Sequence, residues 1–169
     1  FNKKLIGSIA ISQVVGSIFA LAFFLLIVIR PKPIYNPQYL VPLGGMVIGN
    51  SMTGINLALN SIESSIEDKR INIEGYLMLG ATPRMAMNKI IQSSFDTAIT
   101  PTLNNIKNMG IISLPGMMTG QILGGVSPLI AIRYQITIMT AIMSSVTICV
   151  FIFLRLAYKK FFNEQDQLI

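Results

Sequence analysis

Charged residues divide the chain into four long stretches that are almost free of charge. These stretches are residues 5–29, 39–62, 97–125 and 133–156; the third contains Lys107, and Arg133 and Arg155 mark the ends of the fourth. A helix needs about 20 mainly apolar residues to cross the hydrocarbon core of a bilayer, so each stretch is long enough for one crossing. The pattern predicts an all-α integral membrane protein with four transmembrane helices in a single domain.

A charged segment, residues 63–96, separates the second and third expected spans and holds nine of the chain's twenty charges. Its sequence predicts a helix that runs from Glu63 to a glycine stop at Gly80, because glycine readily adopts the left-handed conformation past a helix end. Ala81 and Thr82 then turn the chain, and a second helix follows from Thr82 as N-cap and Pro83 as first residue. Two helices joined by so tight a corner form a rigid knob that can transmit force from a partner.

Lysine and arginine counts in the loops predict the orientation of the spans. Nine basic residues fall on one side and three on the other, and the side richer in Lys and Arg is the cytoplasmic one. Both chain ends and the segment 63–96 are therefore expected in the cytoplasm. The nine are Lys3, Lys4, Lys69, Arg70, Arg84, Lys89, Arg155, Lys159 and Lys160, and the three are Arg30, Lys32 and Arg133.

Composition supports the membrane class and excludes several functions. Hydrophobic residues make up 52% of the chain and charged residues 12%, about half the charged share of a soluble domain. There is no histidine and the only cysteine is Cys149, so a disulfide scaffold, a histidine zinc site and a Ser-His-Asp triad are excluded. Cys149 is expected to be a small buried hydrophobe. With no intramembrane carboxylate either, we can assemble no nucleophile and base for an enzyme.

The net charge of +6 does not indicate nucleic-acid binding, because the basic residues stand in small groups beside apolar runs and not along a groove interleaved with aromatics. The chain also lacks the GxxxxGK[ST] phosphate loop, so the usual mode of ATP binding is excluded. No cofactor is expected. The first residue is Phe1, and the apolar run that follows exceeds the length of a signal-peptide core. We interpret the start as a truncation.

Polar residues and helix breakers in the second and third spans suggest that these spans line a translocation path, because such groups are tolerated at membrane depth only against protein or water. Close packing explains the small residues equally well, and Lys107 can either snorkel to an interface or face a cavity. Methionine thioethers are soft ligands that suit Cu(I) better than iron, but methionine also fills irregular cores, so the metal ligands stay unknown. The candidates for the path are Asn50, Ser51, Met52, Thr53, Asn104, Asn105, Met117, Met118, Thr119 and Gln121.

Small residues recur every four positions in the first span, at Ser8, Ser12, Gly16 and Ala20. Such a stripe predicts that another helix approaches closely. The same surface could serve a contact between two copies of the chain.

Part of the charged segment resembles the EAA-type loop of ABC-transporter permeases, through Glu74, Gly80 six residues on, and Ile90 ten residues further. Larger blocks then resemble the FetB-type iron-export permease family, whose plant relatives are aluminium-tolerance permeases. They are Pro-Leu-Gly-Gly-Met-Val-Ile-Gly-Asn-Ser-Met-Thr at 42–53, Leu-Gly-Ala-Thr-Pro-Arg at 79–84 and Leu-Pro-Gly-Met-Met-Thr-Gly-Gln-Ile-Leu-Gly-Gly at 114–125, followed by Ser127-Pro128 and Ala-Ile-Arg-Tyr-Gln at 131–135.

The resemblance implies a permease subunit of the bacterial inner membrane that exports iron or another metal ion with energy from a separate ABC ATPase. It assigns contact with the ATPase to Glu74, Gly80, Ala81, Thr82, Pro83 and Arg84. Membrane lipid and a second permease subunit, giving a homodimer, are the other expected partners. The alternative is an ATP-independent metal carrier or channel, which broken helices at membrane depth would also suit.

Overall fold

The computed structural model describes residues 3–29, 37–109, 115–163 and 167–168. Phe1, Arg30 and Lys32, on which the expected truncation and part of the expected orientation rest, lie outside these ranges. The elements among the described residues are all helical. They are α1 (Lys3–Phe23), the π-helix η1 (Phe24–Ile29), α2 (Pro37–Asp68), α3 (Arg70–Met78), α4 (Pro83–Asn108), α5 (Gly116–Leu123), α6 (Pro128–Ala157) and the 3₁₀ turn η2 (Tyr158–Phe161).

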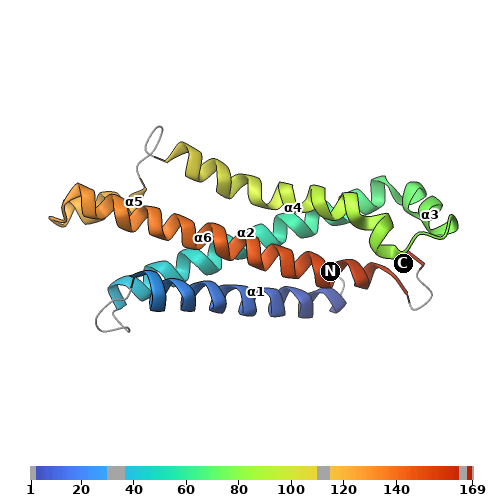
Figure 1. The fold of residues 1–169 in the computed structure, drawn as a ribbon, viewed down its shortest axis with the longest axis horizontal. Coiled ribbons are helices and arrows are strands. Elements are labelled where there is room, and N and C mark those ends of the chain that lie inside the picture. Colours follow the sequence, from blue (N-terminus) through green and yellow to red (C-terminus); the bar gives the residue numbers. More distant parts are fainter. Residues whose placement is uncertain (1–2, 30–36, 110–114, 164–166, 169) are drawn as a thin grey trace.

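The long helices α1, α2, α4 and α6 lie side by side in an elongated bundle (Figure 1). The start of α1, the end of α6 and the short α3 lie toward one end of this bundle, and α5 lies at the other (Figure 1). We call these the α3 end and the α5 end. Both described termini and α3, in the first half of the charged segment, therefore lie toward one end, whereas the second half of that segment runs along the bundle as part of α4. Length and apolar composition qualify two segments as membrane spans, Leu5–Leu26 and Pro128–Phe161.

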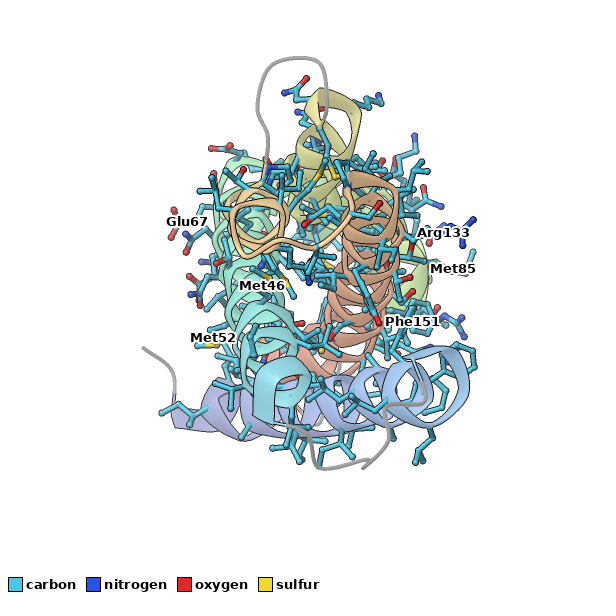
Figure 2. The ribbon with its side chains drawn as sticks, turned by 90° about the vertical axis from the view of Figure 1, so that its left-hand side faces the viewer. Met46, Met52, Glu67, Met85, Arg133 and Phe151 are labelled. Atoms are coloured by element: carbon cyan, nitrogen blue, oxygen red, sulfur yellow. The ribbon has the colours of Figure 1, made fainter. Side chains whose placement is uncertain are left out.

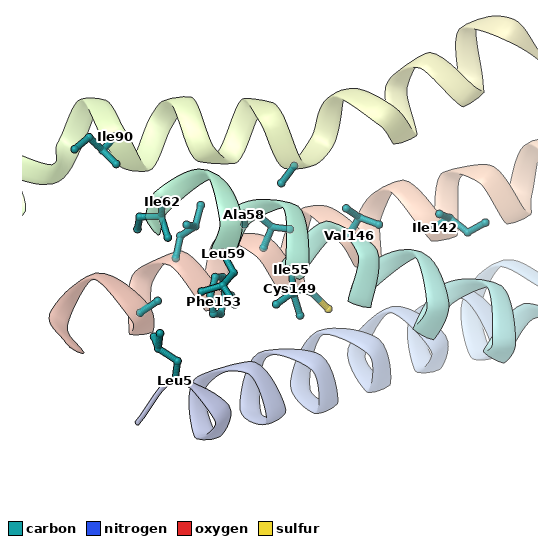
Figure 3. Close-up of a cluster of buried hydrophobic side chains, with 14 of the residues drawn as sticks. Leu5, Ile55, Ala58, Leu59, Ile62, Ile90, Ile142, Val146, Cys149 and Phe153 are labelled. Atoms are coloured by element: carbon teal, nitrogen blue, oxygen red, sulfur yellow. The ribbon is translucent and has the colours of Figure 1, made fainter. Parts of the chain in front are cut away.

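The core is a continuous apolar seam between α2, α4 and α6, with α1 covering one side (Figure 3). In α2 the buried residues follow a helical spacing of three and four, which places them on one face. α6 lies at the centre because it contacts α1, α2, α4 and α5. The labelled members in Figure 3 are Leu5, Ile55, Ala58, Leu59, Ile62, Ile90, Ile142, Val146, Cys149 and Phe153.

Small residues set how closely the helices cross. A Cβ atom on Gly16 would overlap the Sγ atom of Cys149, so α1 and α6 touch backbone to side chain at this position. A Cβ on Gly54 would lie 2.8 Å from Cγ1 of Val146, which marks an equally close crossing of α2 and α6. Ser8, Ser12 and Ala20 are buried too. The predicted small-residue stripe of the first span is thus confirmed as a helix contact, and Cys149 is confirmed as buried.

The structure differs from the expected spans in the third stretch, 97–125. One helix, α4, runs from Pro83 through the second half of the charged segment to Asn108, and a separate short helix, α5, begins at Gly116. Pro115 has no amide hydrogen to continue a helical ladder and stands instead as the N-cap of α5. The helix expected from Glu63 to Gly80 is also divided, because α2 ends at Asp68 and α3 begins at Arg70.

Candidate functional site

The predicted corner at residues 80–84 has the expected geometry. Gly80 has φ +84°, and two hydrogen bonds close the end of α3: the Gly80 amide donates to the Leu77 carbonyl and the Ala81 amide to the Tyr76 carbonyl. This pair of bonds defines a Schellman motif, which satisfies carbonyls left free at a helix end. Thr82 is the N-cap of α4, its side chain accepting from the Met85 amide at 3.4 Å, and Pro83 follows as first residue.

The inner side of this corner is fixed to the bundle. Ile73 on α3 and Met87 and Ile90 on α4 are almost completely buried, and all three belong to the same apolar cluster as the central helix α6. Because packed side chains resist displacement, these contacts hold the corner firmly against the helices of the bundle. The predicted rigid knob therefore has a physical basis in these contacts.

The outer side of the corner exposes apolar side chains at the charged end of the bundle. Leu79 is 87% exposed, Met78 86%, and Met85 70%. Ile71 is exposed to the same degree as Met78. Large apolar side chains that are exposed outside the expected spans are typical of a protein interface. We call Ile71, Met78, Leu79 and Met85 the corner patch.

Charged groups surround the corner patch. Arg70 Nε lies 3.1 Å from Glu74 Oε1, one turn apart on α3, and both side chains are about half exposed. Arg84 and Lys89 are exposed on α4. A cavity of about 680 Å³ lies beside the corner, lined by Glu74, Leu77, Met78, Gly80, Ala81, Thr82, Gln167 and Leu168. The six residues predicted to contact a partner therefore lie together at one end of the molecule.

The path candidates on α2 do not share one environment. Ser51 is fully buried and lies 2.7 Å from Ser145 Oγ on α6, in a contact between helices. Asn50 is half-buried and donates to the Met46 carbonyl one turn back. Met52 and Thr53 are exposed, and Figure 2 shows Met52 on the outside of the bundle. The structure thus gives Ser51 a packing role.

The remaining path candidates also lie apart. Asn104 and Asn105 are exposed on α4. Met117, Met118, Thr119 and Gln121 are half-buried on α5, a helix with no buried residue, and Thr119 Oγ1 donates to its own helix at Pro115. The cavities of about 560, 680 and 320 Å³ in the described part of the chain are lined by none of the ten candidates.

A buried polar cluster joins α1, α2 and α6, and most of it was not predicted. Gln13 Nε2 donates to Ser17 Oγ and to the Ile48 carbonyl, both at 3.1 Å. Ser17 Oγ lies 4.0 Å and Ser145 Oγ 3.9 Å from Cys149 Sγ. Hydrogen bonds between helices of this kind stabilise membrane bundles. The contacts that join helices, Gln13 with Ile48 and Ser17 with Cys149, have partners far apart in the sequence, so no spacing within one helix indicates them.

A polar stripe on α4 was also missed, although the sequence contains its signal. Polar residues recur every four positions at Asn88, Gln92, Asp96, Thr100 and Asn104, and all five are exposed. Residues four apart lie on one face of a helix. Only Asn104 was among the path candidates: Asn88, Gln92 and Asp96 fall in the charged segment 63–96, and Thr100, although inside the third expected span, was not chosen.

Comparison with known proteins places these features in a family. The model of the uncharacterised protein family UPF0014 matches residues 2–162. The chain is 36% identical over 168 residues to the UPF0014 membrane protein slr1647 of Synechocystis, covering 99% of this chain and 65% of the relative. It is 36% identical over 135 residues to the probable iron export permease protein FetB of Escherichia coli, covering 80% of this chain and 52% of that protein.

A plant relative extends the comparison. Protein ALUMINUM SENSITIVE 3 of Arabidopsis thaliana is 35% identical over 149 residues, covering 88% of this chain and 54% of the relative. The chain thus spans about half to two thirds of the length of the curated relatives that it matches. No solved structure matches it.

Proposed function

The chain belongs to the UPF0014 family of membrane proteins, and from this premise we propose that it is the permease part of an ABC transporter whose corner patch docks on a separate ATPase. The patch carries the proposal. Ile71, Met78, Leu79 and Met85 are exposed outside the expected membrane region, while Met87 and Ile90 behind them are fixed in the core. An interface that must transmit a movement needs both properties.

The proposal includes a topology and a partner copy. The four long helices cross the inner membrane, and the α3 end lies in the cytoplasm, where ATP is hydrolysed. Two copies form a homodimer, because one such subunit makes half of a translocation path. The name of the Escherichia coli relative describes iron export, and on this ground we propose a metal ion, with iron first, as the cargo. Lipid covers the apolar outer surfaces.

A matched pair of charge substitutions tests the docking role. Leu79 is 87% exposed at the α3 end and Leu123 is 83% exposed at the α5 end, so Leu79→Glu and Leu123→Glu change equally accessible side chains. The full-length protein is purified with a tag in mild detergent, and ATP hydrolysis is measured in the eluate. Leu79→Glu is expected to lower the co-purified hydrolysis at least tenfold, because truncating or charging an interface anchor costs about 2 kcal/mol or more.

Leu123→Glu is expected to retain the hydrolysis of the unaltered protein. Equal loss in both variants would contradict docking at the corner. If the unaltered protein carries no ATPase and still conducts metal ions in liposomes, the ATP-independent carrier replaces this proposal.

A further inference from the structure

The polar stripe on α4, defined by Asn88, Gln92, Asp96, Thr100 and Asn104, is exposed along its length, and its first part borders α6. All five side chains are exposed, whereas the opposite face of the same helix is buried against α2 and α6. The stripe extends over 16 residues, so it is about 24 Å long at 1.5 Å per residue. It therefore follows most of the length of α4.

Close contacts place this stripe beside the middle of an apolar span. A Cβ on Gly54 would lie 2.8 Å from Cγ1 of Val146 and 3.9 Å from the carbonyl oxygen of Ala98. Ala98 therefore lies level with Val146, close to the middle of the candidate span Pro128–Phe161. Asp96 and Thr100 flank Ala98 on α4, so a carboxylate and a hydroxyl stand at the depth where α6 carries the hydroxyls of Ser144, Ser145 and Thr147 but no charge.

The outer face of α1 shows what a lipid-facing surface of this bundle looks like. Its exposed side chains at comparable positions are Ile11, Val14, Val15, Ile18 and Phe19. Amides and a carboxylate are not tolerated in contact with acyl chains. The exposed face of α4 must therefore meet water or protein.

The stripe also retains unused hydrogen-bonding capacity. Within the described ranges, the side chains of Asn88, Gln92, Asp96 and Asn104 make no hydrogen bond, while Thr100 Oγ1 donates to the Asp96 carbonyl at 2.6 Å. A cavity of about 560 Å³ borders the first part of the stripe. Asn88, Gln92 and Asp96 of the stripe line it on one side, and Phe151, Arg155 and Tyr158 line it on the other. The cavity leaves room for water along the first part of the stripe, from Asn88 to Asp96.

We propose that the α4 stripe is the water-facing wall of the translocation path and that Asp96 is the group in it that favours cations. This inference rests on the proposed permease function and names the surface that does the transport. Asp96 is the only carboxylate between Glu74 and Glu164, and the stripe adds amide and hydroxyl oxygens. Hard oxygen donors of this kind suit a hydrated divalent cation. Two cations, Arg84 twelve residues away on α4 and Arg155 on α6, line the same cavity as Asp96 at the cytoplasmic side.

Thiol labelling tests whether the stripe faces water. In a full-length Cys149→Ala protein in membranes, single cysteines replace Thr100 or Asn104 in the stripe, and Val15 or Ile18 on α1 as matched controls. The probe is the membrane-impermeant cationic methanethiosulfonate MTSET. The stripe cysteines are expected to react at least tenfold faster than the α1 cysteines. Reaction as slow as that of the α1 cysteines would overturn the proposal.

A second labelling measurement tests the role of the Asp96 charge and does not require the cargo to be known. The rate of labelling at Thr100→Cys is compared for cationic MTSET and anionic MTSES, with and without Asp96→Asn. Removing one charge about one helical turn away is expected to lower the MTSET-to-MTSES ratio roughly tenfold. An unchanged ratio would overturn the role of Asp96. Neither labelling measurement needs an ATPase. Both results can therefore be interpreted even if the Leu79→Glu experiment shows that the corner patch does not dock.

Discussion

The two ends of the bundle use the same turn, yet only one of them has the features of a docking site. Gly80-Ala81-Thr82-Pro83 joins α3 to α4, and Gly125-Val126-Ser127-Pro128 joins α5 to α6. Gly80 and Gly125 have φ +84° and +88°. At the second turn the Gly125 amide donates to Ile122 and the Val126 amide to Gln121, which again makes a Schellman motif.

The ends differ in anchorage and charge. α3 and the start of α4 place Ile73, Met87 and Ile90 in the core, whereas α5 has no buried residue. Charged residues surround the first turn, while Arg133 is the only charge between residues 116 and 133. Turn geometry and exposed apolar side chains therefore do not indicate a coupling site by themselves. A corner transmits force only where its inner face is packed.

The largest expected difference between the two ends concerns this packing. Met87→Ala removes a fully buried side chain from the first corner and should lower the free energy of unfolding by about 2–5 kcal/mol. Met118→Ala removes a half-buried side chain from α5 and should cost less, about 1–2 kcal/mol, since part of the side chain is already exposed. Unfolding of the purified full-length protein by SDS titration measures both. Equal costs would mean that both corners are anchored alike.

The next prediction distinguishes a loss of folding stability from a loss of coupling to the ATPase. Gly80→Val and Gly125→Val each force a β-branched residue into the left-handed region, at about 1–2 kcal/mol. A Cβ at either position meets nothing within 4 Å, so backbone strain is the main effect and the two losses of stability should be similar. ATP hydrolysis in the eluate should fall only for Gly80→Val, because the corner patch lies beside that turn.

Gly75→Ala is the control for this pair. Gly75 lies inside α3 with open space around its Cα, so alanine should stabilise the helix by about 0.5–1 kcal/mol. Loss of hydrolysis in Gly75→Ala, or in both valine variants alike, would contradict a specific role for the Gly80 turn.

The first corner could be predicted because its signals are local. Gly80, Thr82 and Pro83 each specify their own conformation through φ, a side-chain cap or a missing amide hydrogen, and neighbours along the chain suffice to interpret them. The small-residue stripe at Ser8, Ser12 and Gly16 could be predicted for the same reason, since its period alone defines a face. The partner helix, α6, could not, because it is distant in sequence.

The continuity of α4 and the packing role of Ser51 could not be predicted from the sequence pattern. Lys89 and Asp96 made the first half of α4 resemble an aqueous loop, whereas packing of Met87 and Ile90 against the core carries the helix straight on to Asn108. From the sequence alone, Ser51 could either line a path or pack against another helix. Its contact with Ser145 on α6 shows that it packs between two helices. Such outcomes depend on contacts between residues far apart in the chain.

The smallest expected difference concerns the caps. Thr82 Oγ1 accepts a hydrogen bond from the Met85 amide at 3.4 Å, whereas Ser127 makes no side-chain cap bond at the start of α6. Thr82→Ala should therefore cost about 0.5–1 kcal/mol, the lower part of the range for N-caps because the bond is long, and Ser127→Ala should cost almost nothing. SDS titration of the two purified variants resolves this difference if it exceeds a few tenths of a kcal/mol. A larger loss for Ser127→Ala would mean that the second turn depends on its cap more than the first, and the two corners would then differ in their turns as well as in their anchorage.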